Sequence, residues 1–360
     1  MKIIILKKDL SEAVQNVQRA VPHKASFPAL EGIYMSTTNN ALSLVGYDGN
    51  MKIETDVNAR IIRTGGAVIS AKLFSDVVKN LPSEEVTIEI DDKFIVTITS
   101  GDAKYELIGI NPIEYPTFEG VESKEKVKID GETLRDMIKT TVYAVSENNT
   151  KPIYTGALFK IKDGEFTIVA IDGYRMAARI EQTDSKLNTE VIIPKKALIE
   201  LINLINDEVT FTIGRRTACF TLNNYTVTTR VIEGQFLDYR QTIPQETKTE
   251  VTISTKDLIK AVERMALLSK DKIQSPVIVN IGENIELTCK SSIGRAREII
   301  NGSVKGESLE MGFNQKYMLE ALKNIEDDKV TIKFNGGLNP LVMSPDKSVI
   351  HLIVPMRLAQ

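Results

Sequence analysis

The chain of 360 residues contains no tryptophan, two cysteines and two histidines. Cys219 and Cys289 both lie in strand-like stretches, so we expect buried thiols in a reducing compartment rather than a disulfide framework. His23 lies in a loop and His351 in an apolar strand, positions that favour packed or edge histidines over catalytic ones. These few residues lie far apart and match no zinc-ligand spacing, so we expect no metal.

Motifs for phosphate binding and catalysis are also missing. There is no G-x-x-x-x-G-K-[ST] loop and no G-x-G-x-x-G fingerprint, so we expect no nucleotide cofactor. The acidic pairs at 91–92 and 327–328 lie in predicted turns, where aspartate is common for backbone reasons. No nucleophile, base and orienting group occur as a set, which argues against an enzyme.

Long hydrophobic runs are absent. No apolar run reaches the roughly 18–20 residues that a membrane-spanning helix needs. The start, MKIIILKKDL, has four consecutive apolar residues, too few for a signal peptide, so we expect a cytoplasmic protein. The content of 42% hydrophobic and 26% charged residues is typical of a globular protein, and the length favours two or three domains.

What the chain does contain is one pattern repeated three times. The segments LSEAVQNVQRAVPHKASFP, LRDMIKTTVYAVSENNTKP and LIKAVERMALLSKDKIQSP begin at Leu10, Leu134 and Leu258, so the period is 124 residues both times. Each opens with apolar residues at the spacing of an amphipathic helix, then breaks into a polar loop that ends at a proline.

A second set of similar segments follows half a repeat later. ISAKLFSDVVKNLPSEEVTIEI, IPKKALIELINLINDEVTFTI and FNQKYMLEALKNIEDDKVTIKF begin at Ile69, Ile193 and Phe313. Each predicts a helix, an acidic turn and a strand with one buried face. The six predicted helices span residues 7–19, 72–81, 130–145, 195–205, 256–270 and 316–326.

The stretches 121–128 and 244–250 are charged and poor in apolar residues, so the linkers between repeats should fall there. The sequence therefore predicts an α+β fold of three tandem domains, each with two helices backed by antiparallel sheets. Their expected limits are residues 1–122, 128–245 and 249–360.

One lysine holds the same place in all three repeats, as Lys72, Lys196 and Lys316. The net charge of −3 argues against a nucleic-acid binder, but the predicted helices are mildly basic and the rest of the chain is acidic. Equivalent domains joined by equivalent short linkers would form an arc with these helices on one side. Such a surface would attract phosphates without reading bases. A solvated lysine without a shared function is the alternative.

Short motifs on this triple repeat point to a family. IDGYRMA in the middle repeat, EGQFLDYRQTIP at its end and VPMRL near the carboxyl terminus, with FPAL and EYP in the first repeat, resemble the bacterial sliding clamp, the beta subunit of the replicative DNA polymerase III. The resemblance implies a non-catalytic processivity factor. It implies a head-to-tail homodimer that forms a six-domain ring with the helices inside. The ring would encircle double-stranded DNA without sequence specificity and tether the polymerase.

The resemblance also implies site residues. A pocket between the second and third domains would take short extended peptides, with a glutamine followed by a Leu-Phe-like pair, from the polymerase III alpha subunit, clamp-loader subunits and other clamp-motif proteins. Its residues would be Tyr154, Ile171, Gly173, Tyr174, Arg175, Met176, Leu237, Gln241, Thr242, Leu338, Pro340, Leu352, Val354, Pro355, Met356, Arg357 and Leu358. DNA contacts would be Lys24, Lys79, Asn148 and Lys151, beside Lys72, Lys196 and Lys316. The dimer contact would pair Tyr105 and Leu107 with Leu267 and Leu268.

The chain departs from the family pattern at several of these positions. Leu237 stands where many members have proline, Gln241 where arginine is expected, and Val354 where methionine is frequent. Ala359 and Gln360 extend past the usual terminal leucine. Plain core packing is the alternative for the apolar pocket residues. For the whole chain, the alternatives are a repeat scaffold that binds proteins but not DNA, and an enzyme with a cleft between repeats.

Overall fold

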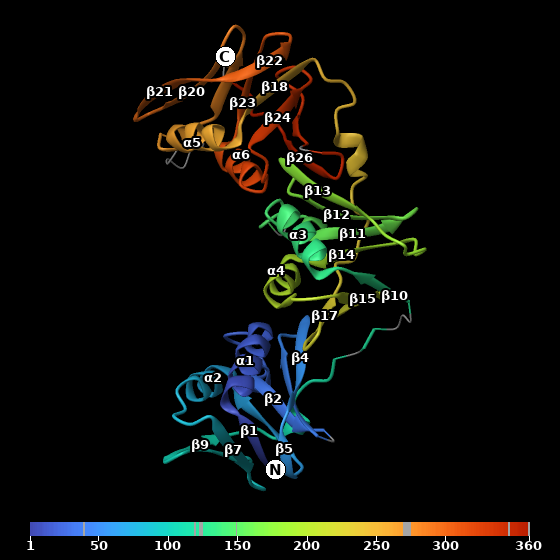
Figure 1. Ribbon diagram of the computed structural model, residues 1–360, viewed down its shortest axis with the longest axis vertical. Coiled ribbons are helices and arrows are strands. Elements are labelled where there is room, and N and C mark those ends of the chain that lie inside the picture. The colour runs from blue at the N-terminus through green and yellow to red at the C-terminus, as the bar shows by residue number, and fades with distance from the viewer. Residues whose placement is uncertain are drawn as a thin grey trace. The chain divides into compact units, whose positions relative to one another are not determined.

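A computed structural model of the chain describes residues 1–38, 40–118, 120–121, 125–148, 150–268, 275–344 and 346–358. The fold divides into two compact units, Met1–Arg135 with Lys196–Val231 and Asp136–Lys195 with Ile232–Gln360. Among the described residues the strands form four sheets, in which neighbouring strands run antiparallel. Figure 1 shows the helices beside the sheets of their own repeats.

The first unit contains two sheets. The five-stranded sheet has the order β5 (Arg60–Arg63), β1 (Lys2–Leu6), β7 (Glu85–Ile90), β8 (Ile95–Ser100) and β9 (Ala103–Ile108). The eight-stranded sheet has the order β10 (Lys126–Ile129), β15 (Val209–Ile213), β16 (Thr217–Thr221), β17 (Thr226–Arg230), β4 (Met51–Asn58), β3 (Ala41–Tyr47), β2 (Gly32–Thr37) and β6 (Gly66–Ser70). The pairing of β17 with β4 makes one sheet from strands of the first and second repeats.

The second unit also contains two sheets. The nine-stranded sheet has the order β14 (Thr189–Pro194), β11 (Gly156–Lys162), β12 (Glu165–Ile171), β13 (Arg175–Gln182), β26 (Val349–Ile353), β25 (Leu341–Met343), β24 (Lys329–Phe334), β18 (Thr249–Ser254) and β22 (Gly302–Gly306). The four-stranded sheet has the order β21 (Gly294–Ile300), β20 (Ile285–Ser291), β19 (Val277–Ile281) and β23 (Leu309–Phe313). Here β13 of the second repeat pairs with β26 of the third.

The α-helices of the described residues match the six predicted ones in place. They are α1 (Lys7–Val17), α2 (Ala71–Lys79), α3 (Gly131–Val142), α4 (Lys195–Leu204), α5 (Thr255–Ala266) and α6 (Gln315–Leu322). Each ends before its predicted limit. After α1, for example, residues Gln18–Ala20 tighten into a 3-10 turn, a common way for a helix to end.

The apolar faces of the helices build the core, as their spacing predicts. The buried face of α1 consists of Leu10, Ala13, Val14 and Val17. The equivalent face of α5 is buried as well, with Leu258, Ala261, Val262 and Met265. Packing one stripe of each helix against its surroundings removes that apolar surface from water, which is the main favourable contribution to folding.

Strands extend further into the expected linkers than the sequence suggests. β10 begins at Lys126 and β18 at Thr249, because these short charged stretches add strands to the sheets. Residues 122–124 of the first expected linker lie outside the described residues. The expected domain limits stay a prediction, since the two compact units do not follow the repeats.

Both cysteines are free thiols, but one of them is less buried than the sequence predicts. Cys289 is buried, whereas Cys219 is only half-buried. Successive side chains of a strand point to opposite faces, and the neighbouring Phe220 takes the fully buried face of β16. Cys219 therefore lies on the less covered face.

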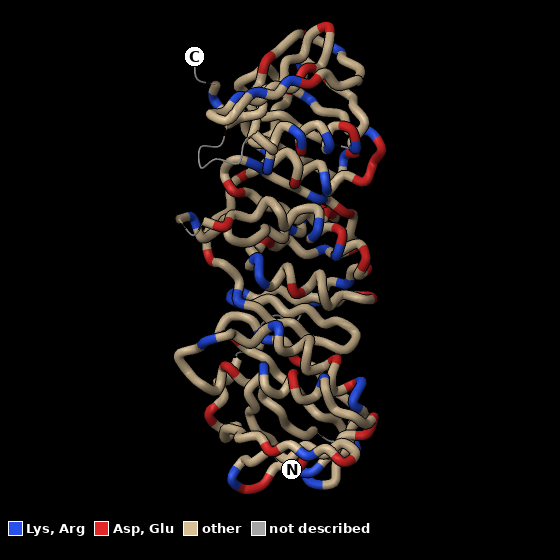
Figure 2. Tube along the Cα trace, turned by 90° about the vertical axis from the view of Figure 1, so that its left-hand side faces the viewer, with Lys and Arg blue, Asp and Glu red and all other residues tan. Residues whose placement is uncertain are grey.

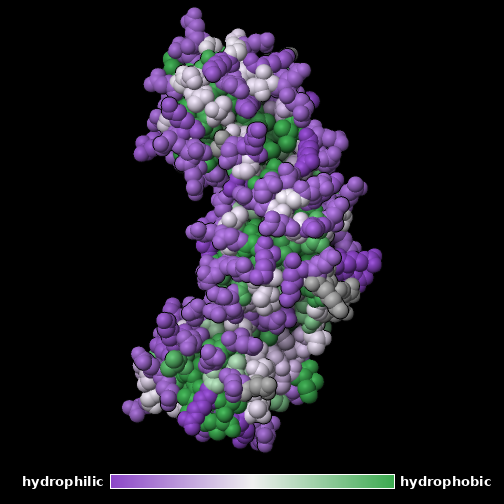
Figure 3. All heavy atoms as spheres, turned by 45° about the vertical axis from the view of Figure 1, so that its right-hand side comes forward, coloured by the Kyte–Doolittle hydropathy of each residue, from purple (hydrophilic) through white to green (hydrophobic). Residues whose placement is uncertain are grey.

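The surface carries both signs of charge. Figure 2 shows Lys and Arg interspersed with Asp and Glu along the trace. Hydrophilic side chains cover much of the face in Figure 3, and apolar side chains show between them. Across the described part of the chain, no helix has the length and apolar character needed to cross a membrane.

Candidate functional site

The turn between β12 and β13 holds three predicted site residues, Gly173, Tyr174 and Arg175, in different surroundings. Oδ1 of Asp172 accepts hydrogen bonds from the backbone N–H groups of Tyr174, at 2.8 Å, and Arg175, at 3.0 Å. Gly173 has a φ of +95°, a left-handed conformation that glycine adopts without strain. The turn leaves Tyr174 63% exposed, whereas Arg175 is 7% exposed.

Arg175 is held by four side chains. Its guanidinium lies 5.3 Å from the ring centroid of Tyr143 and 4.5 Å from that of Tyr317. Its Nε donates to Asp172 at 2.9 Å, and its Nη1 donates to Glu320. Burial alone would lower the pKa of Arg175, but the bonds and charges of Glu320 and Asp172 raise that pKa above its ordinary value. The cation therefore joins the second repeat to α6 of the third.

The tail that follows β26 is tied down at two points. The N–H of Val354 donates to the carbonyl of Tyr174 at 2.8 Å, and the N–H of Met356 donates to the carbonyl of Gly312 at 2.8 Å. Gly312 leaves room for the tail, because a Cβ there would lie 2.6 Å from Cδ2 of Leu358 and 3.1 Å from the carbonyl oxygen of Met356. These contacts place the tail beside the Tyr174 turn and the end of β23.

An apolar cluster contains side chains from the same two repeats. Its buried members come from strands of the second and third repeats and from the segment before β18. They are Leu158, Val169, Ile171, Met176, Ala178, Ile192, Phe236, Tyr239, Val342 and Leu352, with Ile153, Tyr154, Ile232, Ile243 and Ile350 packed against them. We call this set the floor cluster.

The floor cluster brings several predicted pocket residues together. Ile171, Met176 and Leu352 are members, and Tyr154 packs against them. Thr242 donates its hydroxyl to the carbonyl of Tyr239 and lies 3.8 Å from the sulfur of Met176. Of the tail residues, Pro355, Met356 and Leu358 are half-buried and Arg357 is exposed.

Other predicted pocket residues are not members of the floor cluster. Leu338 is 87% exposed on the loop between β24 and β25, and Pro340 of the same loop is half-buried. Leu237 is 44% exposed, and the exposed Gln241 donates to Asp238 at 2.9 Å. Ala359 and Gln360 lie outside the described residues.

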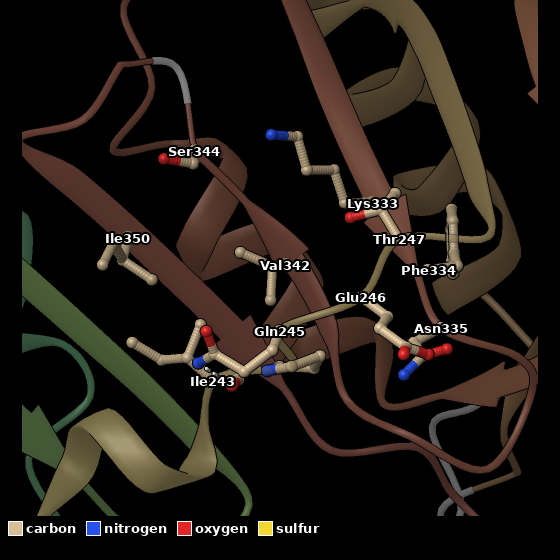
Figure 4. Close-up of a pocket in the computed structure, with 11 residues that line it drawn as sticks. Ile243, Gln245, Glu246, Thr247, Lys333, Phe334, Asn335, Val342, Ser344 and Ile350 are labelled. Atoms are coloured by element: carbon tan, nitrogen blue, oxygen red, sulfur yellow. Dashed lines mark hydrogen bonds between the residues drawn. The ribbon is translucent and has the colours of Figure 1, made fainter.

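A separate cavity of about 260 Å³ lies along the segment that leads into β18 (Figure 4). Ile243, Val342 and Ile350 line it on the apolar side, and Lys333 and Glu246 contribute charge. The described tail residues do not line this cavity, but it borders the floor cluster, because Val342 is a member of that cluster and Ile243 and Ile350 pack against it.

None of the four residues that hold Arg175 is among the predicted site residues; they are Tyr143, Asp172, Tyr317 and Glu320. The sequence does carry a repeat pattern that could have indicated Glu320. An acid follows the repeated lysine by four positions each time, as Asp76, Glu200 and Glu320. Glu200 also bonds an arginine of the preceding repeat, because Arg19 approaches it at 3.4 Å.

His351 is a packed histidine, as its apolar strand predicts. The side chain is fully buried in β26, and its Nδ1 lies 2.8 Å from the hydroxyl of Tyr143. Its Nε2 has no hydrogen-bond partner among the described residues. Burial lowers the pKa of His351 to about 4, so the ring is neutral at pH 7.

The predicted DNA contacts are all exposed: Lys24, Lys72, Lys79, Asn148, Lys151, Lys196 and Lys316. Two of the lysines have partners. Lys196 forms an ion pair with Asp48 of the first repeat, and the ammonium of Lys151 lies 5.6 Å from the ring centroid of Tyr154. Asn148 accepts a hydrogen bond from the N–H of Thr150 at 2.9 Å, which stabilises its own loop.

Within the described residues, no three His, Cys, Asp or Glu side chains form a metal-binding group.

We expect Glu320→Gln to destabilise the junction between the second and third repeats. The substitution removes one of two acids that compensate a buried cation, and such losses cost about 2 kcal/mol or more. Urea unfolding should show the loss. Glu326→Gln is the control, because Glu326 is exposed and forms no ion pair in the described structure. Equal stability of the two variants would contradict the role given to Glu320.

We expect His351 to reduce stability below pH 6.5. The folded chain holds the pKa of His351 at about 4 and the unfolded chain near 6.5, so the unfolded chain binds an extra proton between these values. Stability is unaffected above pH 6.5, falls as the pH decreases, and has lost about 2 kcal/mol at pH 5. His351→Gln should flatten this part of the stability profile in urea unfolding. The exposed His23, changed to Gln, should leave the slope as it is.

Known proteins of one family are similar to this chain along its whole length. Residues 1–119, 128–238 and 240–357 match the N-terminal, central and C-terminal domains of the DNA polymerase III beta subunit. The chain is 32% identical to the "Beta sliding clamp" of Bacillus subtilis (strain 168), covering 99% of this chain and 100% of that protein. A crystal structure of the DNA polymerase sliding clamp from Bacillus subtilis superposes with a TM-score of 0.96 at 32% identity over 100% of both chains. A putative DNA polymerase III beta subunit from Eubacterium rectale gives 0.95 at 30% identity, over 99% of this chain and 100% of that one. The chain belongs to the family of DNA polymerase III beta subunits, the beta sliding clamps.

Proposed function

We propose that two copies of this chain join head to tail through β9 and β21 into a closed ring that encircles duplex DNA, and that the tail and floor cluster of each copy bind a partner peptide. Membership of the family makes the chain a sliding clamp that tethers the polymerase, and a non-catalytic processivity factor. The observation that carries the head-to-tail contact is a strand pairing that occurs twice within the chain.

Consecutive repeats are joined by the same pairing. β17 of the second repeat pairs with β4 of the first, with Val227 opposite Ile53. β26 of the third repeat pairs with β13 of the second, with His351 opposite Ala177. In each case the last strand of one repeat adds to the third strand after the first helix of the repeat before it.

Two strands hold the matching places and, among the described residues, pair on one side only. β9 is the last strand of the first repeat and an edge of its sheet, and β21 is the third strand after the first helix of the last repeat and an edge of its sheet. An edge strand offers unpaired N–H and C=O groups to another chain. Pairing β9 of one copy with β21 of another would join the two chains in the same way as the strand pairs that join consecutive repeats within one chain.

The internal register also specifies which residues would meet. Traced across the paired strands of each sheet, Tyr105 in β9 holds the place of Val227 in β17. In the same way Ala296 in β21 holds the place of Ile53 in β4. Tyr105 would therefore lie opposite Ala296. The next pair would set Glu106 opposite Arg295, a favourable pair of opposite charges.

This register differs in part from the dimer contact that the family resemblance implies. Leu107 is 7% exposed and therefore belongs to the core of its own repeat, and Leu268 packs against the core of the third repeat. Tyr105 is half-buried and Leu267 is 59% exposed, so these two remain available for contact. A head-to-tail contact closes into a ring when the rotation fits, and otherwise forms a filament.

The partner-peptide proposal rests on the tail and the floor cluster. The tail supplies half-buried apolar side chains, and the Tyr174 turn supplies an exposed aromatic ring beside it. Apolar anchors of this kind give a short extended peptide most of its affinity. The proposed partners are the polymerase III alpha subunit, clamp-loader subunits and other proteins with a clamp motif.

The proposed ring can be tested by a disulfide across β9 and β21. Tyr105→Cys with Ala296→Cys should give a covalent dimer under mild oxidation, because opposite residues of an antiparallel pair have their Cβ atoms about 4.5–5.5 Å apart. The band is read on a non-reducing gel. The same variant loaded on nicked circular DNA should then resist release by high salt.

A register-shifted pair serves as the control for this cross-link. Lys104→Cys with Ala296→Cys would place the two thiols on opposite faces of the sheet, so it should cross-link poorly. The native Cys289 is buried, and burial raises its thiol pKa, which limits its background reaction. Equal cross-linking of both pairs, or none in either, would overturn the proposed register.

We expect Lys72→Glu with Lys316→Glu to weaken retention on circular DNA and to reduce its salt dependence. Each lysine that contacts phosphate contributes about 0.9 to the slope of log affinity against log salt. Lys196 is left unchanged because it already pairs with Asp48. The control, Lys93→Glu with Lys305→Glu, has the same charge change on exposed residues outside the helices. If both pairs lowered the slope equally, the helix lysines would have no special contact with DNA.

A further inference from the structure

We propose that the first repeat carries a second copy of the partner-peptide pocket, closed by the chain's own Phe118. The ring of Phe118 would occupy the place that an apolar or aromatic partner side chain takes in the second repeat. The inference rests on the partner-peptide pocket proposed above. It explains why each chain would offer one such pocket although the pattern occurs more than once.

The two places match in the register of their hairpins, although the residues differ. In the first repeat Tyr47 pairs with Lys52 across the β3–β4 turn, and in the second repeat Ile171 pairs with Met176 across the β12–β13 turn. Both residues of the second pair lie 124 positions after those of the first, which is the period of the repeat. The two hairpins therefore have the same register.

The segment that follows each repeat returns to the same place. Tyr115 lies against Tyr34 of β2, with the ring centroids 5.4 Å apart. In the second repeat the equivalent residues are Tyr239 and Leu158, and both are buried in the floor cluster. Tyr115 thus brings its segment onto β2, the strand beside the β3–β4 hairpin, and Tyr239 lies in the same cluster as Leu158 of β11, the strand beside the β12–β13 hairpin.

Phe118, three residues after Tyr115, places its ring over the β3–β4 turn of the same chain. The ring of Phe118 meets Tyr47 edge to face, with centroids 5.1 Å apart and planes at 87°. The ammonium of Lys52 lies 5.9 Å from the centroid of the same ring. Phe118 therefore contacts both residues that match Ile171 and Met176.

Thr242 follows Tyr239 by three residues, as Phe118 follows Tyr115, although Thr242 ends the 3-10 turn Tyr239–Thr242 and Phe118 lies beyond the turn Pro112–Glu114. The hydroxyl of Thr242 turns back to the carbonyl of Tyr239 at 2.7 Å, and it lies 3.8 Å from the sulfur of Met176 in the hairpin. A threonine has no ring to place against Ile171. On this proposal, the place that Phe118 fills in the first repeat would be taken in the second repeat by a side chain of the partner peptide.

A tethered side chain is a strong competitor. A group linked through a short segment has an effective concentration in the millimolar range, so a free peptide at micromolar concentration would not displace it. Thr242, at the corresponding place in the second repeat, is too small to act as such a competitor. The difference between one phenylalanine and one threonine would thus select which junction binds partners.

The test exchanges these two residues. The probe is a short fluorescein-labelled peptide with a glutamine ahead of a Leu-Phe pair, titrated into the full-length protein at concentrations that give the number of sites. The unchanged chain should bind one peptide. Phe118→Thr should bind two, and adding Lys52→Met should tighten the second site because it restores an apolar residue where the second repeat has Met176.

The reciprocal change should close the existing pocket. Thr242→Phe should weaken peptide binding at least tenfold, whereas Thr242→Val, which keeps the size of the side chain, should not. Phe118→Thr combined with Thr242→Phe should again bind one peptide. Hydrogen exchange should then show protection at the β3–β4 turn instead of the β12–β13 turn.

The outcomes separate the two proposals. If the unchanged chain binds no peptide, the partner-peptide pocket itself fails. Suppose that the unchanged chain binds one peptide, and that melting curves show the Phe118→Thr variants to be folded. If these variants still bind only one peptide, the proposed closed copy of the pocket is overturned. If Phe118→Thr does not fold, the Thr242→Phe arm decides, since unchanged affinity there would contradict the equivalence of the two positions.

Discussion

Strand pairing between consecutive repeats is the constraint on which the rest of the molecule depends. The ladder between β13 and β26 places Met176 opposite Leu352, so both side chains reach the floor cluster from different repeats. A slip of one residue would turn every side chain of β26 to the other face of the sheet. The same ladder ends where Val354 bonds to Tyr174, and this bond sets the tail beside the turn.

The buried Arg175 reinforces that junction with a different kind of interaction. A cation removed from water needs acids close by, and Asp172 and Glu320 supply them from two repeats. The rings of Tyr143 and Tyr317 lie close to the guanidinium and shield it from water. Because such a site tolerates one arrangement of its partners, the ladder and the cation together define how the turn, α6 and the tail meet.

The repeats and helices could be predicted from the sequence because they depend on local periodicity. The buried faces of α1 and α5 follow directly from the spacing of their apolar residues. The partners of Arg175 and Lys196 could not be predicted, since Glu320 and Asp48 lie in other repeats and no local pattern reports which side chains meet there. The family pattern assigns Leu338 a pocket role but does not predict how exposed it is, and in the structure this side chain is 87% exposed.

The tail is a local variant of a feature that all three repeats share. After the last strand of each repeat, one residue bridges back to the strand before the second helix: Ile110 to Val68, Ile232 to Ile192, and Met356 to Gly312. The third of these bridges uses a glycine, and a Cβ at that position would meet the side chain of Leu358. The bridge therefore anchors the tail by the same kind of backbone hydrogen bond as its counterparts, while the missing side chain lets Leu358 lie close to the sheet. Anchored in this way, the Val-Pro-Met-Arg-Leu segment can keep apolar side chains half-buried at the surface without becoming part of the core.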